Sequence, residues 1–392
     1  MDKKKRTILS VMAMSFVGMS MGAVTPALAE ISKVFPTAPS TTISLLATIP
    51  TLCSIPCSLL AGKFVGKQVK YRTLAITGIM ILLVCGVTPI FLQSLKAIVF
   101  MRGLMGCGLG LIIPLGYSIT MNTLSVQEAE VQMGRNNFMA SVGGIVFQLI
   151  GGFLSNISWH YCFASYLIVI PVLLILLLYM EEPTYSADAL AAMSQIPGNR
   201  IPKIGISLLF WSLFYGLFMV LFYPMITDIS GIISNSNIGT SSDSALVLSS
   251  FTLGSAIGSL ILSKIITRIK KYTFVISGLL CSLGFFLLSI GQNLVTMFTA
   301  AFIFGLGFGM FAPAITLFAG MSVKPQTRPF AMSILSFMGG IGSFSSAYIF
   351  AGLRNLFQIS DDRFAIAMSA AVYLMITIGF LIYFMGRRRK PT

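Results

Sequence analysis

The chain carries one arginine inside a run of residues that is otherwise apolar enough to cross a membrane. Arg102 opens the segment RGLMGCGLGLIIP, which ends at Pro114. A charged side chain in such a run is costly in lipid, so it indicates a functional site facing the protein interior or a water-filled cavity. Arg102 could bind a substrate anion, tune a proton-coupling acid, or lock an outer gate by pairing with an acid or with helix-end carbonyl groups. No Asp or Glu lies within an apolar run, and the acids nearest to Arg102 are Glu30 and Asp228, at the outer ends of the first and seventh runs.

Other residues that could do chemistry do not assemble into a catalytic or metal-binding pattern. Cys53 and Cys57 match Gly254 and Gly258 in the second half of the chain, so both positions favour a small residue and the thiols are expected to pack between helices. His160, the only histidine, has no nearby Cys, Asp or Glu partner. The glycines from Gly106 to Gly110 follow no strand of a nucleotide-binding unit. We therefore expect no enzyme activity, no catalytic residue, no metal site and no cofactor.

The composition is that of a polytopic membrane protein. Of 392 residues, 56% are hydrophobic and only 9% are charged, and the mean hydropathy is +0.91. These values exclude a water-soluble globular chain of this length. The net charge of +15 is typical of basic cytoplasmic loops in such proteins, so we expect no nucleic-acid partner. The expected location is the plasma membrane.

Apolar windows of membrane-spanning length predict twelve helices. With the N-terminus in the cytoplasm, nearly all of the 26 Lys and Arg residues fall on the cytoplasmic side. The exceptions are Lys33, Lys96, Arg354 and Arg363, which fall outside, and Arg102, which lies within a span. This asymmetry places both termini in the cytoplasm. The first apolar run also resembles a cleavable signal, but Pro26 has a repeat partner in Pro224, so we expect this helix to be retained.

The two halves of the chain repeat one another in the same direction. The glycines and proline of the opening segment recur from Gly305 to Pro313, and Glu30 recurs as Asp228, whereas the position matching Arg102 is Ala301. This pattern predicts an all-α membrane protein of twelve transmembrane helices, built as two six-helix parallel repeats. The expected domains are residues 1–181, a cytoplasmic linker 182–203, and residues 204–392 with a basic tail.

The repeat and several motifs resemble the major facilitator superfamily. The loop after the second span keeps the family's Gly62, Lys67 and Lys70, although Gly66 and Val69 replace its Asp and second Gly. The fourth helix keeps an Arg followed by small residues, with Met105 where Gln is common. The fifth helix has Phe147 and Gln148 in place of the Gly-Pro pair of exporter subfamilies. The resemblance implies alternating access around a midplane cavity, lined by the first, fourth, seventh and tenth helices.

Aromatic residues form one face on two of these helices. Trp211, Tyr215, Phe218 and Phe222 follow helical spacing, as do Phe304, Phe308 and Phe311. Such stripes can be lipid-facing or core packing, but in this family they would suit the cavity wall. The expected substrate-binding residues are Arg102, Met105, Gln148, Trp211, Tyr215, Phe218, Phe304 and Phe308. The expected coupling or gating residues are Glu30, Arg102, Asp228, Lys67 and Lys70.

These expectations favour a secondary transporter that exports a small amphipathic organic compound or drug, linked to protons, by alternating access. One alternative is an organic-anion exchanger or uniporter that uses Arg102, and another is a non-transporting membrane sensor or scaffold. The expected partners are a small-molecule substrate, the proton as coupling ion and the lipid bilayer, and we expect a monomer.

The topology can be tested by cysteine labelling. A cysteine introduced between Lys264 and Lys271 should react with an impermeant reagent only from the cytoplasm, because this loop belongs to the basic side. A cysteine at Asn235 should react only from outside. Opposite labelling of the two positions would overturn the predicted architecture.

Overall fold

The computed structural model describes residues 3–65, 69–124, 126–182, 205–269, 272–323, 328–359 and 361–388. Two compact units divide the chain, within residues 1–201 and 202–392. Twelve helices of the described residues, six in each unit, are long and apolar enough to cross a membrane. The predicted all-α, twelve-helix fold of two six-helix repeats is therefore confirmed.

The described residues of the first unit form ten helical segments. They are α1 (Lys3–Phe16), η1 (Val17–Ala27), α2 (Leu28–Val34), α3 (Ser40–Phe64), α4 (Tyr71–Val87), η2 (Thr88–Phe91), α5 (Leu95–Thr123), α6 (Val126–Ser155), η3 (Trp159–Ile168) and α7 (Val169–Tyr179). Those of the second unit form eight. They are α9 (Ile206–Phe222), α10 (Pro224–Thr227), α11 (Ile229–Asn235), α12 (Ser241–Ile269), α13 (Thr273–Ile290), α14 (Leu294–Met321), α15 (Arg328–Phe357) and α16 (Phe364–Arg388).

The first span of each unit is broken in its second half. In the first unit, α1 gives way to the 3₁₀ segment η1, where Met19 leaves helical backbone angles and Pro26 follows. In the second unit, α9 ends before Pro224, and α10 and α11 continue in short pieces. Proline removes a backbone N–H and so interrupts the helical ladder. The repeat partners Pro26 and Pro224 thus produce a break in the same part of each unit.

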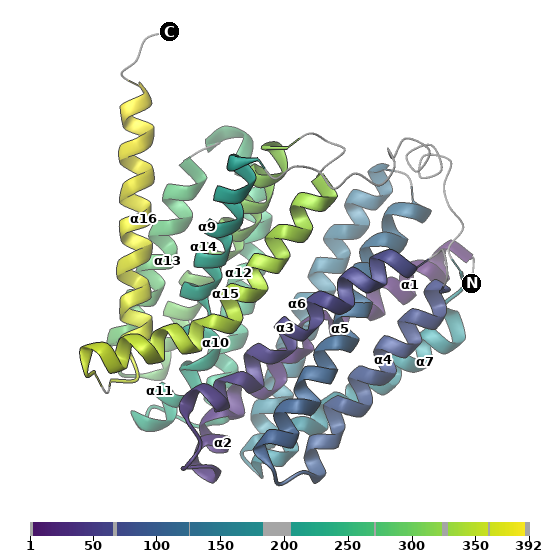
Figure 1. Ribbon diagram of the computed structural model, residues 1–392, viewed down its shortest axis with the longest axis horizontal. Helices are drawn as coiled ribbons and strands as arrows, with labels where there is room; N and C mark the ends of the chain where they lie inside the picture. The colour runs from purple at the N-terminus through teal and green to yellow at the C-terminus, as the bar shows by residue number, and fades with distance from the viewer. Residues whose placement is uncertain are drawn as a thin grey trace. The chain divides into compact units, whose positions relative to one another are not determined.

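Glycines bring the same pair of helices close together in both units. In the first unit α5 packs along α3, and in the second α14 packs along α12 (Figure 1). A Cβ atom at Gly106 or Gly110 would overlap the backbone of Pro50 or Ser54 in α3. One at Gly305 or Gly309 would overlap Phe251 or Ser255 in α12. Only glycine allows this backbone approach, so the repeated glycines fix the separation of these helices.

The start of the predicted linker is attached to the first unit. The carboxylate of Glu182 accepts hydrogen bonds from the backbone N–H groups of Tyr71 and Arg72, at 3.1 and 2.9 Å. It therefore caps the N-terminus of α4, where unpaired N–H groups favour a negative charge. The rest of the predicted linker lies outside the described residues.

Helix contact through glycine can be tested by adding a single methyl group. Gly110→Ala should lower the unfolding temperature of the purified protein, because the new methyl group has no space beside the Ser54 carbonyl. Overpacking of this kind costs about 1–3 kcal/mol. The control is Gly352→Ala in α15, where a Cβ atom would meet no other atom within 4 Å. Equal unfolding temperatures for the two variants would contradict the packing argument.

Candidate functional site

Arg102 lies completely buried in the first unit, and all three of its guanidinium nitrogens have protein partners. Nε donates to the Leu46 carbonyl oxygen at 2.8 Å, and Nη2 donates to the Met21 carbonyl oxygen at 2.9 Å. Nη1 donates to the Tyr166 hydroxyl at 2.5 Å, and that hydroxyl donates to the Ser20 carbonyl oxygen at 2.9 Å. Arg102 and Tyr166 together form a clamp, hereafter the Arg102 clamp, that joins α5 to η1, α3 and η3.

The acceptors of the clamp lie where regular helical bonding fails. In an α-helix the Leu46 carbonyl would accept from residue 50, but Pro50 has no N–H to offer. Ser20 and Met21 lie in η1, beside the kink at Met19. A carbonyl left unpaired in a membrane costs several kcal/mol, and the Arg102 clamp satisfies three of them.

The acids expected near Arg102 pair with other residues. Among the described residues, none brings a carboxylate within 4.0 Å of Arg102. Glu30 forms an ion pair with Lys33 at 2.8 Å, and Asp228 forms one with Arg354 at 2.9 Å. Backbone oxygens therefore solvate the Arg102 charge. Of the acid and carbonyl partners considered from the sequence, the structure has carbonyls.

The other first-unit residues expected in the site have separate surroundings. Met105 is buried, with its sulfur 3.3 Å from Arg102 Nη1. Gln148 is buried in α6, and its side chain lies against Gly22 of η1. Lys70 is an exposed residue directly before α4, and Lys67 lies outside the described residues. Met105 and Gln148 are thus near the clamp, and Lys70 is not part of it.

The two aromatic stripes of the second unit meet in one cluster. Phe218 of α9 stacks on Phe308 and Phe311 of α14, with ring centroids 5.3 and 5.0 Å apart. Phe222 lies 4.4 Å from Phe308, and Phe304 stacks on Phe285 of α13 at 3.9 Å. Phe218 and Phe304 are 1% and 0% exposed, so their rings form the core of the unit.

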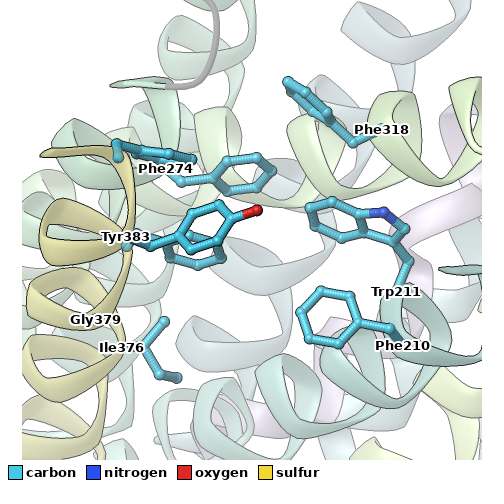
Figure 2. Close-up of a pocket in the computed structure, with 9 residues that line it drawn as sticks. Phe210, Trp211, Phe274, Phe318, Ile376, Gly379 and Tyr383 are labelled. Atoms are coloured by element: carbon cyan, nitrogen blue, oxygen red, sulfur yellow. The ribbon is translucent and has the colours of Figure 1, made fainter. Parts of the chain in front are cut away.

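Trp211 leads from this cluster to an open pocket of about 560 Å³ (Figure 2). The pocket lies where α9 and α13 begin and α14 and α16 end, which the sequence predicts to be the cytoplasmic end. Its lining contains seven aromatic residues, Phe210, Trp211, Phe274, Phe318, Phe380, Tyr383 and Phe384. Figure 2 shows the Tyr383 hydroxyl directed toward the Trp211 ring across the pocket. We call this site the aromatic pocket.

The aromatic pocket has the chemistry of a site for a flat or amphipathic molecule. Its volume falls within the range of small-molecule sites, and none of the described residues that line it is acidic or basic. Trp211 stacks on Phe274 with centroids 5.5 Å apart and lies 5.8 Å from Phe318. Phe210 and Tyr383 are 53% and 52% exposed, so the rim of the pocket is accessible.

Sequence reasoning missed several residues of both sites. Tyr166 carries no signal in the sequence beyond its place in an aromatic-rich segment. Arg354 was counted in an outer loop, but it lies in the last turn of α15. The pocket residues of α13 and α16 were not predicted, although Ile376, Phe380, Tyr383 and Phe384 of α16 follow helical spacing and could have indicated this face. Within the described residues, no group of three or more His, Cys, Asp or Glu side chains could hold a metal ion.

Known proteins with sequence similarity include members of one family of membrane transporters. The family model of the Major Facilitator Superfamily matches residues 10–233 and 204–392. A curated relative is the "Proton-coupled antiporter flippase LtaA" of Staphylococcus haemolyticus (strain JCSC1435), which is 28% identical over 141 residues. That match spans 35% of this chain and 35% of the relative, about a third of its length.

Solved structures share the fold along nearly the whole chain. The xylose transporter XylE from E. coli has a TM-score of 0.76 at 13% identity, with 97% of this chain and 96% of that chain covered. A bacterial homologue of the human lysosomal transporter Spinster has a TM-score of 0.71 at 16% identity, covering 100% and 98%. The human organic anion transporter MFSD10 has a TM-score of 0.65 at 14% identity, covering 97% and 100%. With two matches of the family model across residues 10–392, this chain belongs to the major facilitator superfamily and is a membrane transporter.

Proposed function

We propose that this transporter exports a small amphipathic organic compound and that export is linked to the movement of protons. The observation that carries the proposal is the aromatic pocket, whose lining is almost entirely aromatic and whose rim is accessible. Aromatic faces bind planar rings and organic cations, with gains of about 0.5–1.5 kcal/mol for each ring pair beyond the burial of area. A sugar would need many more hydrogen-bonding groups than this lining offers.

The proposed substrate contacts centre on Trp211. Its indole ring packs beside both Phe274 and Phe318, and the Tyr383 hydroxyl supplies a polar group on the opposite side (Figure 2). Tyr215 and Phe308 are half-buried and continue the aromatic surface along α9 and α14. Phe218 and Phe304 support this surface from within the core, where they are enclosed by other rings.

The name of the curated relative supports the proton coupling in this proposal. That name describes a proton-coupled antiporter and a flippase. An antiporter that admits protons as it releases substrate gives export driven by the proton gradient. We extend this class of activity to the present chain, with an amphipathic compound as substrate.

An organic-anion transporter that binds its substrate through Arg102 has less support. Arg102 is fully buried, and each guanidinium nitrogen already donates to an oxygen of the protein. A substrate carboxylate would have to displace backbone carbonyls that have few other donors. We therefore assign Arg102 to the support of the first unit and not to the substrate.

The aromatic pocket can be tested with two matched variants in α14. Phe318→Ala removes a ring from the pocket, whereas Phe298→Ala removes an exposed ring that does not line it. With ethidium as the probe, we expect the first variant to raise the dissociation constant about two- to tenfold, corresponding to the loss of aromatic contacts. The second should bind ethidium as the wild type does. Calorimetric titration of the purified proteins measures both, and equal affinities would remove the pocket from the proposal.

The role of Arg102 can be separated from substrate binding by a second set of variants. Arg102→Ala should lower the unfolding temperature strongly, because it leaves buried carbonyls unpaired at about 1–3 kcal/mol each. Arg102→Lys should recover part of the lost stability, because an ammonium group can still donate to one or two of the acceptors. The recovery should be incomplete, because it cannot reach all three acceptors of the guanidinium group. Benzoate and ethidium binding by the folded fraction should match the wild type. If Arg102→Lys instead keeps its stability and loses benzoate binding, the organic-anion alternative is correct.

A further inference from the structure

A partly buried ion pair lies in the second unit, away from the aromatic pocket. Asp228 occupies the break between α10 and α11, and Arg354 lies in the last turn of α15. Arg354 Nη2 donates to Asp228 Oδ2 at 2.9 Å, so the pair joins two membrane helices that are far apart in the sequence. Both residues lie at the end of the unit that the sequence predicts to face outside.

This ion pair is the most enclosed of those formed by the described residues. Its side chains are 24% and 18% exposed, whereas the side chains of the other three pairs are between 36% and 55% exposed. A partly buried pair is stronger than a surface pair while it is intact, and breaking it leaves two poorly solvated charges. The remaining exposure still gives water a path to the carboxylate.

The hydrogen bonding of the pair is incomplete. Asp228 Oδ1 accepts from the Thr227 hydroxyl at 2.7 Å, and only one Arg354 nitrogen reaches the other carboxylate oxygen. The same nitrogen donates to the Asp362 carbonyl oxygen at 3.2 Å, while the buried Nε of Arg354 has no partner. A two-pronged contact between arginine and carboxylate would be tighter. The ion pair between Asp228 and Arg354, held by a single hydrogen bond, is therefore easier to break and to form again than a two-pronged pair.

The matching position of the first unit has a different arrangement. Glu30, the repeat partner of Asp228, pairs with Lys33 one turn along the same helix, and both side chains are exposed. Both residues of this pair belong to α2, so loss of the pair would break no contact between two helices. Glu30 therefore provides a matched control for Asp228.

Other charged groups near Asp228 have partners of their own. In the turn before α16, Asp362 accepts from Asn235, and Asp361 accepts from the Arg363 backbone N–H. Arg363 donates to the Ser289 carbonyl and to the Ser236 hydroxyl. Asp243 at the start of α12 accepts from Thr240. Among the described residues, Arg354 is the one cation paired with Asp228.

We propose that Asp228 is a proton-binding site and that Arg354 is its exchangeable counter-ion. A proton that binds Asp228 Oδ2 neutralises the carboxylate, while Arg354 keeps its charge and loses its partner. The contact between α15 and the α10–α11 break then opens, and loss of the proton closes it again. The inference rests on the proposed proton-linked export, to which it assigns the titrating residue.

The proton site can be measured without any substrate. Purified full-length protein in lipid is titrated with acid, and infrared difference spectra record the carbonyl band of newly protonated carboxyl groups. We expect Asp228→Asn to lose one component of this band and Glu30→Gln to keep that component. Asp228→Glu, which retains a carboxyl group, should restore it if Asp228→Asn folds poorly. An unchanged component in folded Asp228→Asn would overturn the proposal.

Coupling is tested in proteoliposomes with ethidium as the probe. Asp228→Asn should lose accumulation driven by an imposed proton gradient but keep exchange of ethidium between the two sides without a gradient. Glu30→Gln should keep both activities. Gradient-driven accumulation in Asp228→Asn, or equal loss of both activities in folded protein, would overturn the inference. A wild type that exchanges no ethidium would instead contradict the proposed function, and the infrared result would still decide the proton site.

Discussion

The first unit depends on satisfying the backbone of its broken helices inside a membrane. Lipid offers no hydrogen bonds, so each carbonyl freed by a proline or a kink needs a donor from the protein. Arg102 supplies donors to Leu46 and Met21, and Tyr166 supplies one to Ser20. The bent first span and the proline-containing second span are stable together because one side chain bonds to both.

The two units share their packing and differ in their chemistry. The glycines of α5 and α14 approach α3 and α12 at equivalent positions, so the helix pairs have the same separation. Ala301 stands where the first unit has Arg102, and aromatic rings fill the second unit. Tyr373 donates to the Phe218 carbonyl there, as Tyr166 does to Ser20 in the first unit. A common scaffold therefore holds a charged clamp in one unit and an aromatic core with an apolar pocket in the other.

The sequence predicted the fold well because hydropathy indicates the membrane-spanning helices and the repeats indicate that the two halves share one arrangement. Twelve apolar windows, the glycine pattern and the paired prolines all correspond to features of the structure. The candidate site was predicted less completely. The acceptors of Arg102 are backbone carbonyls, which have no signature in a sequence, so the sequence could not decide between acids and carbonyl groups as its partners. Arg354 follows an apolar run and reads as a loop residue, and only the length of α15 brings it to Asp228. The pocket combines residues of four helices, and the stripe in α16 could not by itself indicate which other helices meet it.

The Arg102 clamp also has a consequence for how the chain is assembled during synthesis. Its acceptors lie in the first and second spans, its arginine in the fourth, and its tyrosine in the sixth. The early spans therefore leave the ribosome with unpaired carbonyls, and their donors arrive later. Arg102 itself costs about 2.5–3.5 kcal/mol to insert alone, but less when earlier helices offer it oxygens. The fourth span thus needs carbonyl groups of the first two spans to insert Arg102, and those spans need Arg102 as a hydrogen-bond donor. The hydrogen bonds of the first unit are complete only when Tyr166 enters the membrane.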